Sequence, residues 1–191
     1  MKIYPNIFHI AATIIPVAIA GYLFHDFMKQ YLFTPFTVAV GLILGSFLMI
    51  FADYYYKRTQ RNEQIGYKRA FLVGAFQCLA LWPGMSRSGS TISGGIISGM
   101  DHKNAASYSF ICAVPVMFMA TAFELLKTGA SINSRELILL ITGFIVAFVV
   151  GWASIVFLLK LLSKIKLFPF AIYRIILAII ILASAIGGKT A

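Results

Sequence analysis

One short segment of this 191-residue sequence gathers the residue types that bind phosphate groups in proteins. It reads Pro-Gly-Met-Ser-Arg-Ser-Gly-Ser-Thr-Ile-Ser over residues 83–93. Arg87 is the only charged residue between Arg69 and Asp101, and hydroxyl side chains stand on both sides of it. A guanidinium presents a planar fork of donors that matches phosphate oxygens, and hydroxyls add donors without adding charge. The segment therefore predicts a phosphate site.

The backbone of this segment could also bind an anion, because its glycines allow tight turns and expose N–H groups. A helix expected to begin near Ser90–Thr91 would direct its free N–H groups and its dipole at the loop. We expect the phosphate to contact Gly84, Ser86, Arg87, Ser88 and Thr91. The competing interpretation is a hairpin packed closely against other helices, which explains the small residues but not a buried arginine.

The composition indicates a membrane protein. Hydrophobic residues make up 60% of the chain, charged residues 12%, and the mean hydropathy is +0.89. Soluble domains are about 45–50% apolar and about 25% charged, so a soluble enzyme, a disordered chain and a disulfide scaffold are excluded. The net charge of +10 lies mainly in short loops between apolar runs. That distribution orients membrane proteins and contacts anionic lipid, so we expect no nucleic-acid partner.

The phosphate segment must be positioned by an all-α membrane domain over residues 1–191. Five apolar runs are long enough to span the bilayer, approximately residues 7–24, 36–52, 105–126, 136–159 and 168–186. The basic loops 54–69 and 160–166 are expected in the cytoplasm. Residues 70–100 must then enter the membrane from the cytoplasmic side and return to the same side. Their two apolar arms are too short to cross and flank a Pro-Gly break, which predicts a re-entrant helix–loop–helix.

Two further polar residues could contact a lipid headgroup. Arg174 lies inside the last apolar run, where it could extend toward the cytoplasmic face or turn inward to an anion. Gln77 lies about one helical turn before the break. Other polar residues are expected to have structural roles: His9, His25, the helix-capping segment Asp101-His102-Lys103, and the packing cysteines Cys78 and Cys112.

The segment Pro83-Gly84-Met85-Ser86-Arg87-Ser88 with Thr91 resembles the signature of the undecaprenyl-diphosphate phosphatase family, the bacitracin-resistance type. Its flanks, 76–82 and 93–95, and the later segment 169–174 are similar to the family too. The resemblance implies an enzyme that hydrolyses undecaprenyl diphosphate to undecaprenyl phosphate and inorganic phosphate, and so recycles the lipid carrier for peptidoglycan synthesis. It implies Arg87 and Ser86 as catalytic residues, with Arg87 binding phosphate, Ser86 a phosphate ligand or nucleophile, and Thr91 a further ligand.

The resemblance also implies the setting of this chemistry. The expected location is the bacterial inner membrane, the partner is a polyprenyl diphosphate lipid, and a homodimer is left open. The expected cofactor is a divalent cation, Mg or Ca, for which this sequence shows no ligands. The family fold is an inverted repeat in which each half holds one re-entrant hairpin.

This sequence departs from the family in one respect. The family's N-terminal half-site, with glutamates spaced Glu-x-x-x-Glu, has no match here, so we expect the C-terminal part of the repeat in a shortened chain. The six carboxylates are expected near the ends of the spans or in loops, away from Arg87: Asp26, Asp53, Glu63, Asp101, Glu124 and Glu136. Hydrolysis needs proton handling or a metal, so a transporter or binding protein for polyprenyl phosphate or another anionic lipid is the alternative function.

Overall fold

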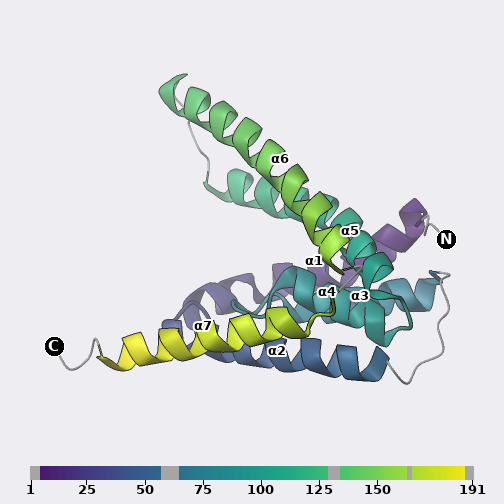
Figure 1. The fold of residues 1–191 in the computed structure, drawn as a ribbon. Helices are drawn as coiled ribbons and strands as arrows, with labels where there is room; N and C mark the ends of the chain where they lie inside the picture. The colour runs from purple at the N-terminus through teal and green to yellow at the C-terminus, as the bar shows by residue number, and fades with distance from the viewer. Residues whose placement is uncertain (1–4, 57–64, 129–133, 163–164, 188–191) are drawn as a thin grey trace.

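The computed structural model describes residues 5–56, 65–128, 134–162 and 165–187. Within these residues the chain forms seven α-helices (Figure 1). They are α1 (Ile7–Tyr31), α2 (Pro35–Tyr56), α3 (Tyr67–Leu79), α4 (Arg87–Ile97), α5 (His102–Thr128), α6 (Ser134–Leu162) and α7 (Phe168–Gly187). Glu63 and parts of both basic loops lie outside the described residues.

Five of the described helices, α1, α2, α5, α6 and α7, are long and apolar enough to cross a membrane. This confirms the predicted all-α membrane class. The helices run past most of the expected limits, because helical hydrogen bonding continues into the polar ends. In α1, for example, the helix passes the expected end at Phe24 and stops at Tyr31. The start of α1 is set by Asn6 and His9, which form a capping box, so His9 has a structural role.

Helices α3 and α4 form the expected helix–loop–helix. They have 13 and 11 residues, which correspond to about 20 and about 16 Å, well short of the roughly 30 Å of hydrocarbon. These lengths support a re-entrant hairpin. The predicted start of the second arm near Ser90–Thr91 is wrong, because α4 already begins at Arg87. The hydroxyl of Ser86 caps it by accepting a hydrogen bond from Gly89 N at 3.1 Å.

Helix α4 lies at the centre of the packing. It contacts α2, α3 and α5, and every residue from Gly89 to Ile96 is buried. Helices α2 and α7 run side by side, whereas α6 extends away from the rest of the bundle over most of its length (Figure 1). Within α6, an 18-residue apolar stretch contains no buried residue, as expected for a helix that faces lipid tails.

A buried polar network joins α1, α3 and α5 beside the hairpin. The hydroxyl of Thr13 donates to Ala70 O at 2.9 Å and lies 2.6 Å from the Tyr108 hydroxyl. Tyr108 also donates to His9 O at 3.0 Å. In apolar surroundings such bonds are hard to replace, so the network ties α1 both to the first arm of the hairpin and to α5.

Candidate phosphate site

The loop between α3 and α4 lies directly on α2, in a groove made by two glycines. A Cβ atom added to Gly41 would come within 2.3 Å of Pro83 O, and one added to Gly45 within 2.5 Å of Met85 O. Side chains at these positions would push the loop backbone away. The Gly41-x-x-x-Gly45 spacing is typical of close helix contacts in membranes, and it is the sequence signal that could have revealed this groove.

Ser86 holds an unusual backbone conformation at the start of α4. Its φ is 68°, and among the described residues it is the one non-glycine residue with a positive φ. Such a conformation costs about 1–3 kcal/mol and is often found at functional sites. It lets the Ser86 side chain cap α4 at Gly89 and also line a cavity with Ser88.

Replacement of Ser86 with glycine is expected to separate stability from function. Glycine adopts positive φ without strain and costs only a few tenths of a kcal/mol as a helix cap, so thermal stability should stay equal or rise. Phosphate binding should fall, because one hydroxyl donor is lost. Thermal unfolding in detergent and binding of a lipid phosphate measure the two effects. Unchanged binding would show that the Ser86 hydroxyl is not a ligand.

Arg87 turns toward α5. Its Nη1 atom donates to Ser109 O at 3.4 Å, and the Ser109 hydroxyl forms a short hydrogen bond with the Thr91 hydroxyl. Thr91 Oγ1 also bonds to Arg87 O and Ser88 O within the first turn of α4, at 2.9 and 3.2 Å. Thr91 and Ser109 are fully buried, so they brace the first turn of α4 rather than face open space. Nothing in the sequence distinguishes Ser109 from other serines, and we did not predict it.

A cavity of about 260 Å³ opens on another side of the same loop. Its polar lining comes from Ser86, Ser88, Tyr173 and Arg174. Its apolar wall comes from α2, α4, α6 and α7, together with Leu167 just before α7. Leu158 and Phe170 are part of this wall. The cavity therefore combines donors for an anion with a surface for a hydrocarbon chain.

Arg174 turns inward, which settles the choice between its two expected orientations. It is 9% exposed, and its Nη2 atom forms a short hydrogen bond with Gly84 O in the loop. Its Nε atom is buried without a partner among the described residues. Gly45 provides the space, since a Cβ there would lie 2.6 Å from Nη2. A buried guanidinium with an unused donor is costly unless an anion approaches.

The structure thus brings only some of the predicted site residues together. Gly84, Ser86, Ser88 and Arg174 meet at the loop and its cavity, whereas Arg87 and Thr91 lie toward α5. Gln77 is 1% exposed, both of its amide atoms are unpartnered within the described residues, and it lines neither of the two cavities described here. Its contact with a headgroup stays a prediction.

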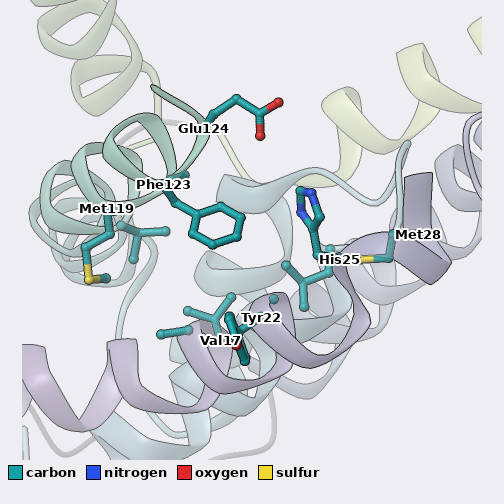
Figure 2. Close-up of a pocket in the computed structure, with 12 residues that line it drawn as sticks. Val17, Tyr22, His25, Met28, Met119, Phe123 and Glu124 are labelled. Carbon is teal, nitrogen blue, oxygen red and sulfur yellow. The ribbon is translucent and has the colours of Figure 1, made fainter. Parts of the chain in front are cut away.

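A larger cavity of about 450 Å³ lies between α1 and α5 (Figure 2). His25 and Phe123 line it, with their ring centroids 5.4 Å apart, and Glu124 lies at its side. Glu124 Oε1 accepts a hydrogen bond from Lys29 Nζ at 2.9 Å, which makes the two side chains an ion pair. This cavity shares no lining residue with the cavity at Ser86, and neither Arg87 nor Arg174 lines it, so we do not place it in the candidate phosphate site.

Asp53, Asp101 and Glu124 are bonded to groups other than Arg87. Asp101 caps α5 through Asn104 N at 2.7 Å, as expected for a helix start, and Asp53 pairs with His102. No group of three His, Cys, Asp or Glu side chains gathers within the described residues. The loop offers hydroxyls and guanidinium groups, which suit an anion. The residues described here therefore do not fit a divalent cation.

Known proteins are similar to this chain over most of its length. Residues 3–180 match the bacitracin resistance protein BacA family. The undecaprenyl-diphosphatase of Bacillus subtilis strain 168 is 51% identical over 180 residues, which is 93% of this chain and 65% of that protein. The undecaprenyl-diphosphatase of Geobacillus kaustophilus is 48% identical over 92% of this chain and 66% of its own length.

A third relative gives the same result. The undecaprenyl-diphosphatase of Exiguobacterium sibiricum is 49% identical over 91% of this chain and 63% of its own length. The chain therefore spans less than two thirds of the length of these relatives. Its own family match nevertheless covers almost all of its residues, from 3 to 180. This multi-pass membrane chain belongs to the bacitracin resistance protein BacA family.

Proposed function

We propose that this protein takes part in the hydrolysis of undecaprenyl diphosphate to undecaprenyl phosphate and inorganic phosphate. The observation that carries the proposal is the cavity at the loop, where Ser86, Ser88 and Arg174 face an apolar wall. A nucleotide has no hydrocarbon chain to pack against the apolar wall, and a plain hydrocarbon has no acceptor for the hydrogen-bond donors of the cavity. A diphosphate joined to an isoprenoid chain satisfies both. The names of the relatives support the same substrate.

In this proposal the two arginines have different tasks. Arg174, with Ser86 and Ser88, binds the phosphate that carries the isoprenoid chain, and the wall with Leu158 receives the first isoprene units. Arg87, at the first turn of α4, binds the terminal phosphate and stabilises the charge that develops as the anhydride bond breaks. Ser86 stays a ligand or nucleophile candidate, and Thr91 braces the turn. The location is the inner membrane of a bacterium.

The test is phosphate release by the purified protein in lipid nanodiscs. We expect release from undecaprenyl diphosphate and from a C15 diphosphate, and much less from inorganic pyrophosphate, which lacks a chain for the apolar wall. The assay is run with Mg²⁺, with Ca²⁺ and with a chelator. Absence of release from the lipid substrates in every condition would contradict the proposal.

A second function is favoured by the distribution of the carboxylates. Asp53 and Asp101 are bonded to other groups, so neither is placed to activate a nucleophile at Arg87. A protein that binds or moves an anionic lipid without hydrolysis would need no such base. Binding of undecaprenyl phosphate without phosphate release would favour this function, and transfer of a labelled lipid between leaflets would identify transport.

A further inference from the structure

Three helix ends meet at one buried carboxylate outside the phosphate site. Asp53, in the last turn of α2, is 6% exposed, and His102, the first residue of α5, is 7% exposed. His102 Nε2 donates to Asp53 Oδ1 at 2.7 Å, and Phe168 N, the first residue of α7, donates to Asp53 Oδ2 at 2.8 Å. Tyr56 packs edge-on against the His102 ring at 4.5 Å. The proposed chemistry uses none of these groups.

This arrangement is more specific than ordinary packing. The first N–H groups of a helix have no partner inside the helix, and Asp53 supplies one for α7 from a different helix. Its negative charge also lies at the N-terminal, positive end of the α5 and α7 dipoles. Both carboxylate oxygens are used, so removing either partner leaves a buried polar group unpaired.

The carboxylate is joined to the phosphate site through the two helices that it anchors. Ser109 lies seven residues after His102 on α5, about 10 Å along the helix axis. Arg174 lies six residues after Phe168 on α7, about 9 Å along its axis. Ser109 accepts from Arg87 and bonds Thr91, while Arg174 bonds Gly84 O. A shift at the anchored ends would move both contacts with the loop.

We propose that Asp53 and His102 are positioning residues, which hold α5 and α7 in the register at which Ser109 and Arg174 reach the loop. The proposal rests on the proposed function, since it assigns the loop the task of binding a lipid phosphate. It differs from a purely structural role in one respect: Asp53 acts on the substrate through Arg174. Loss of Asp53 should therefore cost little once Arg174 is already absent.

A double-mutant cycle tests this difference. Asp53→Asn and Arg174→Gln are made singly and together, and binding of undecaprenyl phosphate, phosphate release and thermal unfolding are measured for each. We expect Asp53→Asn to weaken lipid-phosphate binding about tenfold in the parent protein and less than about twofold in the Arg174→Gln background. The fall in unfolding temperature should be the same in both backgrounds. Equal losses of binding in both backgrounds would overturn the proposal.

His102 provides a milder variant if Asp53→Asn does not fold. His102→Gln keeps an N–H donor for Asp53, whereas His102→Leu removes it at similar volume. We expect the glutamine variant to retain more binding than the leucine variant, and the leucine effect to shrink in the Arg174→Gln background. Equal binding by the two variants would overturn the positioning role. Glu124→Gln, which breaks an exposed ion pair on α5, is the control and should bind normally.

The readouts keep this inference apart from the proposed function. If the parent protein binds undecaprenyl phosphate but releases no phosphate, hydrolysis is contradicted and the cycle is still read on binding. If the parent protein releases phosphate normally and Asp53→Asn weakens binding by the same factor with and without Arg174→Gln, hydrolysis stands and the positioning role fails. A parent protein that binds no lipid phosphate overturns both.

Discussion

Replacement of Arg87 with alanine is expected to lower phosphate release from a polyprenyl diphosphate by about 10²–10³-fold. Arg87 is the first residue of α4, a helix whose free N–H groups and dipole already favour an anion at this end. No other cation is found between residues 69 and 101 of the sequence to take its place. The decrease should appear mainly in kcat, because the charge on the terminal phosphate grows as the anhydride bond breaks.

Two variants show whether the loss comes from the guanidinium. Arg87→Lys keeps a positive charge but loses the planar fork of donors, so it should fall between the parent protein and Arg87→Ala. Lys29→Ala removes an exposed cation on α1, far along the chain from the loop, and should release phosphate normally. Arg87→Ala with unaltered kcat and KM would remove Arg87 from the chemistry.

Replacement of Gly84 with alanine is expected to be the most damaging single methyl addition in the loop. Gly84 has a φ of +93°, and a Cβ there would lie 2.2 Å from Val38 O and 2.9 Å from Leu42 N on α2. The backbone conformation alone costs about 1–3 kcal/mol for a residue with a side chain, and the clash with backbone atoms adds to it. We expect a clear fall in the unfolding temperature together with loss of lipid-phosphate binding.

Gly143 provides the matched control for this substitution. It lies in α6, and a Cβ added there meets no atom within 4 Å. Gly143→Ala should therefore leave both unfolding temperature and binding close to those of the parent protein, measured in the same detergent. If Gly84→Ala behaved like Gly143→Ala, the close approach of the loop to α2 would be contradicted.

Local patterns in the sequence were enough to predict much of the scaffold. Long apolar runs predicted the five spanning helices, since a helix satisfies its backbone polar groups within one segment in lipid. The Pro-Gly break predicted the two short arms around the loop. The start of α4 was missed by one turn, because the capping bond of Ser86 depends on a positive φ that no local preference predicts.

The candidate phosphate site depends on contacts between distant parts of the chain. Arg174 reaches Gly84 O across 90 residues, and Asp53 meets Phe168 across 115 residues. The sequence determined that a cation and hydroxyls occupy a break between two short helices in a membrane, because charge, hydropathy and turn residues act locally. Only the tertiary structure decided that Arg174 and not Arg87 lines the cavity, and that Gly41 and Gly45 admit the loop. Those outcomes depend on which helix surfaces approach closely, and close approach is set by side chains far apart in the sequence.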